Sequence, residues 1–411
     1  MSAADSLPSP ARSGVPGSRR ASGELPSEAW LVALAALPDV GPARLAALLD
    51  MGAADATFAD LAGGRVRATP ALAAACGRDP GGLLARWRAA ASELDVGRLW
   101  DRHLAAGVRV LLPDDPHWPV RLVGDPDPPP LLFVLGDTAA LGPHPTAAVV
   151  GTRRCTQYGL DTARHLGEGL ARAGVGVVSG LAAGIDGAAH RGALAATAVA
   201  GRSTTAPPVG VVGTGLDVPY PRGHERLWGE VGAAGVLLAE APLGTRPARW
   251  RFPARNRILA ALADVVVVVE SAERGGAMHT VDEALRRDRP VLAVPGPVQS
   301  AASAGTNRLL RDVATPCCEL DDVLLALGLD PAGPGTTADQ ADRRPPPTGL
   351  AAAVLNALGW LPATLDSLVT RTGQELGPVA LALAGLSADG WIVADGPWYQ
   401  RVRADSGGVR A

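Results

Sequence analysis

Glycines stand at three positions in this chain where an anion could bind. Gly151, Thr152 and Arg153 follow one Val-rich run, Ser179, Gly180 and Gly184 follow a second, and Gly275-Gly276 opens a helical pattern. Glycine lets backbone amides approach a phosphate closely, and a helix N-terminus adds partial positive charge. The spacing therefore indicates turns whose backbone amides bind phosphate. The alternative, which the sequence leaves open, is that these glycines serve only to form tight turns.

Positive charge is concentrated between residues 222 and 257. This stretch holds seven arginines against three glutamates, and the chain contains no lysine. Arginines interleaved with aromatic rings suit a groove that tracks a phosphate backbone and stacks bases. A solvated loop in an arginine-biased protein is the alternative. The candidate binding residues in this stretch are Arg222, Arg249, Arg251, Phe252, Arg255, Asn256 and Arg257.

The elements that must position these residues are short, Val-rich strands that alternate with helical patterns. Such runs are typical of strands buried on both faces of a parallel sheet. The pattern predicts a doubly wound, Rossmann-like α/β domain over residues 106–328, with ligands bound at the carboxyl ends of the strands. We expect strands at 147–150, 175–178, 209–212, 236–238, 265–269 and 291–294, with edge strands at 108–112 and 130–135, and helices at 158–173, 186–196, 224–231, 256–262 and 278–287.

The first two turns do not match a dinucleotide site. Arg153 and Arg154 follow Gly151 where a G-x-G-x-x-G motif would continue, and Ser179 stands where a ribose-binding carboxylate is expected. We therefore expect no cofactor. The sequence shows no metal cluster and no Ser/His/Asp relay, and we interpret His190 and His279 as structural histidines with satisfied hydrogen bonds.

Other segments flank this domain. Residues 1–25 are interpreted as a disordered tail, 26–105 as a small helical domain, 329–348 as a linker, 349–405 as a winged helix and 406–411 as a second tail. Residues 37–42 suit a helix-hairpin-helix, as in SAM-like domains, or an ordinary helical packing turn. No signal peptide or membrane span is evident, and the four cysteines are expected to be free thiols, so we predict a cytoplasmic protein.

Several motifs in order resemble the DNA-processing protein A family (DprA, also called Smf). The resemblance is carried by residues 150–153, 179–190, 220–221, 252–257 and 294–296. It implies that the chain is a bacterial homodimer that acts in natural transformation (competence) and DNA recombination. Such a protein binds and protects incoming single-stranded DNA, loads the RecA recombinase and is not an enzyme. The resemblance places the basic pocket at Arg153, Arg222, Arg249, Arg255 and Arg257.

Two other functions are weighed against this one. Gly275-Gly276, Thr280 and Glu283 faintly resemble the P-G-G-x-G-T-x-x-E motif of nucleotide phosphoribohydrolases, which have a similar fold. A transcription regulator would act through the winged helix. However, the expected recognition helix, Leu376–Ser387, contains no arginine, and a reader of the major groove needs donors. We therefore predict that the winged helix contacts protein rather than duplex DNA.

Overall fold

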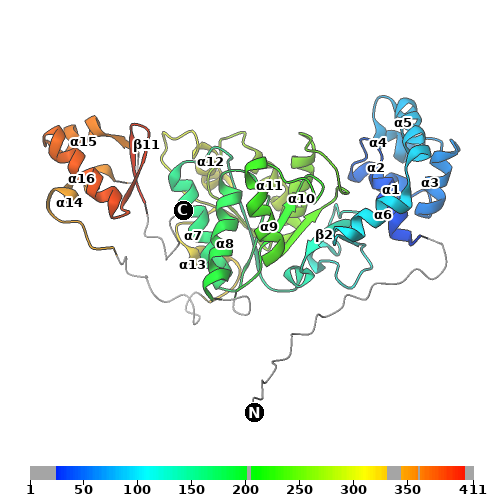
Figure 1. Ribbon diagram of the computed structural model, residues 1–411, viewed down its shortest axis with the longest axis horizontal. Helices are drawn as coiled ribbons and strands as arrows, with labels where there is room; N and C mark the ends of the chain where they lie inside the picture. The colour runs from blue at the N-terminus through cyan, green and yellow to red at the C-terminus, as the bar shows by residue number, and fades with distance from the viewer. Residues whose placement is uncertain (1–24, 201–204, 331–343, 360–361, 403–411) are drawn as a thin grey trace, which may run out of the picture.

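The computed structural model describes residues 25–200, 205–330, 344–359 and 362–402 (Figure 1). Residues 1–24 of the expected N-terminal tail, residues 331–343 of the expected linker and the expected C-terminal tail lie outside these described residues. No helix within the described ranges is both long and apolar enough to cross a bilayer.

A nine-stranded sheet forms the centre of the fold. Its strand order is β1-β2-β6-β5-β4-β3-β7-β8-β9, with β1 and β2 antiparallel to their neighbours and the other strands parallel. The strands are β1 Arg109–Leu111, β2 Leu132–Gly136, β3 Thr146–Val150, β4 Gly176–Ser179, β5 Val209–Val212, β6 Val236–Ala239, β7 Val265–Val268, β8 Val291–Ala293 and β9 Thr315–Pro316. The expected doubly wound, Rossmann-like fold is confirmed.

Helices cover both faces of the sheet because its central strands are apolar on both sides. On β3, Ala147 and Val149 pack into one core, while Ala148 and Val150 pack into the other, as the period of two requires. The first face carries α7 Gln157–Arg172, α8 Ile185–Ala200, α9 Glu225–Ala234 and α13 Leu320–Ala326, and the second carries α10 Arg251–Leu262, α11 Gly276–Leu285 and α12 Ala304–Asp312. The first set faces the viewer in Figure 1.

In the described residues from 25 onward, six helices precede the sheet and pack against the edge that carries β2 (Figure 1). Phe133 of β2 joins the same apolar core as Leu34 and Trp87. Side chains of Thr69, Asp79 and Asp95 cap three of the helices, each accepting a hydrogen bond from a backbone amide three residues later. The helices are α1 Ser27–Ala35, α2 Pro42–Leu49, α3 Ala54–Ala62, α4 Pro70–Cys76, α5 Pro80–Glu93 and α6 Val96–Ala105.

The C-terminal unit has a hydrophobic core of its own, in which Leu355, Leu368 and Leu383 are buried. Its strands form an antiparallel sheet of order β10-β12-β11. The elements are α14 Gly349–Leu358, β10 Ala363–Thr364, α15 Leu365–Thr372, α16 Leu376–Ala388, β11 Ile392–Asp395 and β12 Trp398–Arg401.

Two differences from the expected elements matter. Helix α10 begins at Arg251, five residues before the expected start at Asn256, so the arginines after Trp250 lie on a helix rather than a loop. Pro253 does not prevent this, since the first residues of a helix have no intrahelical acceptor for their N–H groups. Helices α12 and α13, which follow β8, were not predicted.

Helices α7 and α8 approach closely through glycine, which yields a prediction. A Cβ atom on Gly192 would overlap the carbonyl of Arg164, whereas one on the exposed Gly229 of α9 would meet nothing within 4 Å. We expect Gly192→Ala to lower the free energy of unfolding by about 1–3 kcal/mol through overpacking. Gly229→Ala, the matched control, should raise it by about 0.5–1 kcal/mol. Urea denaturation measures both, and an unchanged midpoint for Gly192→Ala would contradict the close packing.

Candidate nucleic-acid interface

A cleft of about 610 Å³ lies at the carboxyl ends of the parallel strands. The chain passes from β3 to β4 on one side, while β7 pairs with β3 on the other, so the strand order reverses at this point. Open α/β sheets bind their ligands at such a switch point. The lining residues are Val150, Gly151, Thr152, Arg153, Arg154, Ala182, Asp186, Tyr220, Arg249, Phe252, Pro253, Arg255, Asn256, Leu259, Gly276, Ala277, His279 and Thr280.

The cleft brings together predicted residues from three segments, which are the turn after β3, the stretch that runs from Arg249 into α10, and the start of α11. They are Gly151, Thr152, Arg153, Arg249, Phe252, Arg255, Asn256 and Gly276. Three arginines at the rim, Arg153, Arg154 and Arg249, are exposed and have no ion-pair partner among the described residues. Their positive charge is therefore available to an anionic ligand.

Aromatic rings lie beside these charges. The ring of Phe252 is 5.2 Å from that of Tyr220, at an interplanar angle of 34°, and the Arg153 guanidinium lies 5.0 Å from the Phe252 centroid. Cation–π attraction favours this arrangement. These tilted, partly exposed rings lie next to guanidinium groups that have no ion-pair partner among the described residues, so the site can accept a base on a ring face and a phosphate beside it.

Arg255 is the buried cation of the cleft. Only 6% of it is exposed, and its Nη1 donates a hydrogen bond to the carbonyl of Val211. The guanidinium lies over Gly180, where any side chain would overlap it. Burial lowers the pKa of Arg255 to about 10, with attraction from Asp186 opposing that fall. The side chain therefore stays charged at neutral pH.

Asp186 is the carboxylate that faces this cation. Burial raises the pKa of Asp186, while Arg255 and backbone amides oppose the rise. Its Oδ2 accepts a hydrogen bond from the Gly180 amide at 3.1 Å. The turn after β4 is thus tied to the start of α8, and the Arg255 guanidinium is held between them.

Some predicted residues support the cleft without lining it. The buried Ser179 hydroxyl donates to the Val149 carbonyl at 2.6 Å, which ties β4 to β3. Gly184 packs on the Thr152 backbone, and Gly275 is the N-cap residue of α11. Arg222 is exposed two residues beyond Tyr220 and does not line the cleft.

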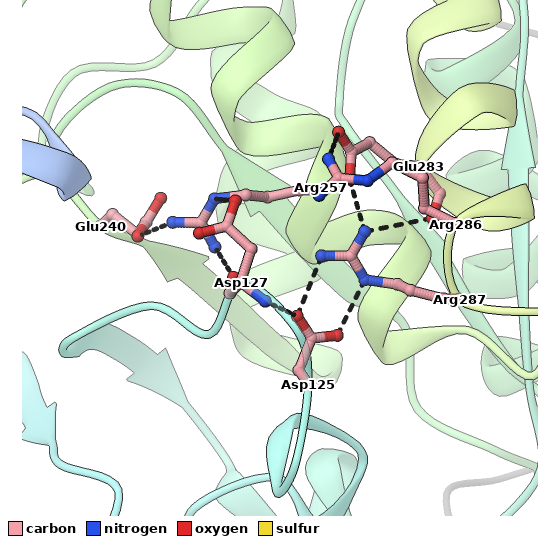
Figure 2. Close-up of polar contacts among 7 residues, drawn as sticks. All are labelled: Asp125, Asp127, Glu240, Arg257, Glu283, Arg286 and Arg287. Carbon is pink, nitrogen blue, oxygen red and sulfur yellow. Dashed lines mark hydrogen bonds and ion pairs between the residues drawn. The ribbon is translucent and has the colours of Figure 1, made fainter.

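The expected roles of two arginines need correction. Residues 252, 255, 256 and 259 share the face of α10 toward the cleft, because a helix repeats every 3.6 residues. Arg257 therefore points away and is buried in ion pairs with Glu240 and with Asp127, at 3.4 Å from the latter (Figure 2). Arg251 stacks on Trp250, with its guanidinium carbon 4.4 Å from the ring centroid.

A second ion-pair group lies beside Arg257 in Figure 2. Arg287 donates to both oxygens of Asp125, at 2.8 and 2.9 Å, and also pairs with Glu283. Glu283 therefore lies outside the cleft and is engaged with arginines, so it is not positioned as the phosphoribohydrolase motif would require. These pairs tie the segment before β2 to α10 and α11.

Sequence reasoning missed several lining residues and misjudged one histidine. Arg154 and Tyr220 belong to motifs that were noticed but were not assigned to the site, and Asp186 gave no signal beyond its place at a helix start. His190 is fully buried, and neither ring nitrogen has a hydrogen-bond partner among the described residues, contrary to the expected satisfied histidine. Burial lowers the pKa of His190 to about 4.

An open, largely parallel sheet with a cationic cleft at its switch point defines a Rossmann-like α/β protein. A family model described as DNA recombination-mediator protein A matches residues 109–328, which is more than half of the chain. The chain belongs to this family.

Relatives and solved structures agree with that assignment. The chain is 44% identical to the putative DNA processing protein DprA of Mycobacterium tuberculosis over 234 residues, or 54% of this chain and 58% of that protein. It is 34% identical to DprA of Bacillus subtilis over 217 residues, which cover 53% and 70% of the two chains. The X-ray structure of DprA from Streptococcus pneumoniae superposes with a TM-score of 0.56 at 30% identity, covering 73% of this chain and 96% of that one.

The ion pair of Arg257 gives a testable contrast. Arg257→Ala leaves Glu240 buried without its charged partner, so we expect the free energy of unfolding to fall by about 3 kcal/mol or more. Arg246→Ala is the control, because Arg246 is exposed on the preceding loop, and it should change stability by less than about 0.5 kcal/mol. Equal unfolding midpoints for the two variants would show that the ion pair does not stabilise the fold.

Proposed function

We propose that this chain binds single-stranded DNA along the cleft at the switch point. Its family and relatives support a role in DNA processing. The observation that carries the proposal is the rim of unpaired arginines beside the stack of Tyr220, Phe252 and Arg153. Phosphates would contact Arg153, Arg154 and Arg249, while a base would lie against the ring of Phe252.

The preference for a single strand follows from the stack. Bases in a duplex already stack on one another and turn their faces inward, so a ring in a cleft cannot reach them without unpairing. An unpaired strand offers both base faces and phosphates at no such cost. Arg255 would supply a fixed charge at the floor of the cleft.

The finer parts of the proposal come from the family resemblance. They are a role in natural transformation, protection of incoming DNA, delivery to the RecA recombinase, a homodimer, a cytoplasmic location and the absence of catalysis. For the competing phosphoribohydrolase activity, AMP is the discriminating substrate. Release of adenine that is abolished by a substitution in the cleft would favour the enzyme over the DNA-binding protein.

The test of the DNA-binding proposal compares oligo-dT with a matched duplex. We expect oligo-dT to bind more tightly than the duplex. The slope of log affinity against log salt concentration should be about −0.7 for each phosphate contacted. Arg153→Ala and Arg249→Ala should each weaken binding several-fold and make the salt slope shallower, since each removes a phosphate contact. Fluorescence anisotropy at several salt concentrations measures both quantities.

The matched control for these variants is Arg65→Ala. Arg65 is an exposed arginine of the helical region that pairs with Asp60 at 2.7 Å, far in sequence from the cleft. It should leave the affinity and the salt slope unchanged. The proposal fails if oligo-dT does not bind the wild type, or if all three variants bind it alike.

For the C-terminal unit, we propose a winged helix that contacts protein. Helix α16 has no arginine, and Leu381 on it is 76% exposed. We expect the segment 349–411 to bind duplex DNA no better than non-specific proteins do, with a Kd above about 1 µM at low salt. Gel-shift titration measures this, and submicromolar affinity would refute the protein-contact role.

A further inference from the structure

The arginine loop, which we define as residues 242–250 between β6 and α10, carries Arg249 to the rim of the cleft. The sheet domain holds the loop at its two ends and through the Gly215 amide, which donates to the Thr245 carbonyl at 3.0 Å. Within the loop, Thr245 bonds back to Pro242, and the Arg251 amide bonds to the Ala248 carbonyl. Arg249 is exposed and has no ion-pair partner among the described residues. Further contacts to the loop come from the preceding helical region.

Helix α6 of the preceding helical region holds the start of the loop. The fully buried His103 accepts a hydrogen bond from the Leu243 amide through Nε2, at 3.1 Å, and donates through Nδ1 to the Leu99 carbonyl, at 2.9 Å. Burial lowers the pKa of His103, with Arg102 adding to the fall and Asp217 opposing it. The neutral ring can therefore act as the acceptor that this contact needs.

An ion pair holds the next residue of the loop. Asp217 accepts from the Gly244 amide through Oδ1, at 2.6 Å, and from Arg102 of α6 through Oδ2, at 2.9 Å. Asp217 follows β5, so this carboxylate joins two loops of the sheet domain to one helix outside it. A Cβ atom on Gly244 would lie 2.7 Å from the Arg102 guanidinium, so the contact is close.

The end of the loop meets a second part of the helical region. The Trp250 ring packs on Gly41 at the start of α2, where an added Cβ atom would lie 2.9 Å from the ring. The arginine loop is thus anchored at both ends by helices α2 and α6. Both helices lie outside residues 109–328, which the family model matches.

We propose that the helical region is a positioning element for single-stranded DNA binding, acting through Arg102, His103 and Asp217 on the arginine loop. The proposal rests on the function proposed above. None of these three residues lines the cleft. They act by fixing the loop before the ligand arrives, so that less conformational entropy is lost on binding. Loosening the anchor lowers affinity without removing a DNA contact.

Asp217→Ala gives the sharpest test, because an electrostatic effect of Asp217 and a positioning role of Asp217 predict opposite changes in DNA affinity. Removing a carboxylate near a phosphate site strengthens binding by simple electrostatics. Loss of the anchor instead weakens oligo-dT binding, by about threefold to tenfold for a loop that must be ordered again. Arg102→Ala should weaken binding to a similar extent. If Arg102 contacted DNA directly, Arg102→Ala would weaken binding while Asp217→Ala would tighten it.

The control variant is Arg98→Ala, one turn earlier on α6. Arg98 is exposed and has no ion-pair partner in the described part of the chain, and its replacement should leave the affinity unchanged. His103→Ala should behave as Asp217→Ala does, and His103→Gln, which can still accept and donate, should restore part of the affinity. Should His103→Ala fail to fold, the two surface variants still decide the matter.

Hydrogen exchange of the Leu243 and Gly244 amides, measured without DNA, separates this proposal from the function on which it rests. Exchange should quicken about tenfold in Asp217→Ala and stay unchanged in Arg98→Ala. If wild-type protein ignores oligo-dT, the proposed function fails, whatever the exchange shows. If the wild type binds and Asp217→Ala binds equally or more tightly, or if its amides exchange at the wild-type rate, the positioning role is overturned.

Discussion

The arrangement of the cleft depends on one buried charge. Arg255 is 6% exposed, yet it lies at the point where the sheet reverses its order, held by the Val211 carbonyl and the field of Asp186. A guanidinium in such a place is costly unless its hydrogen bonds and a counter-charge compensate. Gly180 must lack a side chain to admit it, and Asp186 must start α8 to face it. Three segments that are distant in sequence are thereby fixed relative to one another.

The helical geometry of α10 then divides the neighbouring side chains among three surroundings. Phe252, Arg255 and Asn256 face the cleft, Arg257 faces the carboxylates of Asp127 and Glu240, and Arg251 lies on Trp250. Within two turns, arginine thus lines the cleft at Arg255, forms a structural ion pair at Arg257 and stacks on a ring at Arg251. Burial decides which role applies: Arg257 has its charge satisfied inside the protein, so it has little left to offer a phosphate, whereas Arg249 has no such partner.

Periodicity and turn chemistry were enough to predict the sheet except for β9, which has only two residues and therefore no period to detect. Continuous Val-rich runs such as 265–268 indicate strands buried on both faces, and glycine after β3 marks the switch-point turn. The roles of individual arginines could not be predicted in the same way. The pattern from Trp250 to Arg257 has no clear apolar face, and Pro253 suggests a loop, so nothing local shows that α10 begins at Arg251. One partner of Arg257 is also distant, since Asp127 is 130 residues away in sequence.

The anchors of the arginine loop show why such long-range contacts matter for function. Charged side chains of one sign on a loop repel one another, so no single conformation of the loop is favoured unless contacts with other groups stabilise it. The sheet domain holds the loop at the ends of β6 and α10 and through Gly215 and Asp217. Arg102, His103 and Gly41 add contacts from helices that precede the sheet in sequence and join its core through Phe133. Apolar packing of the helical region on β2 therefore stabilises more than that region itself. It places a histidine acceptor at the Leu243 amide, and it places the Arg102 guanidinium beside Asp217, the carboxylate that accepts from the Gly244 amide. A self-repelling segment thereby becomes a fixed part of the cleft.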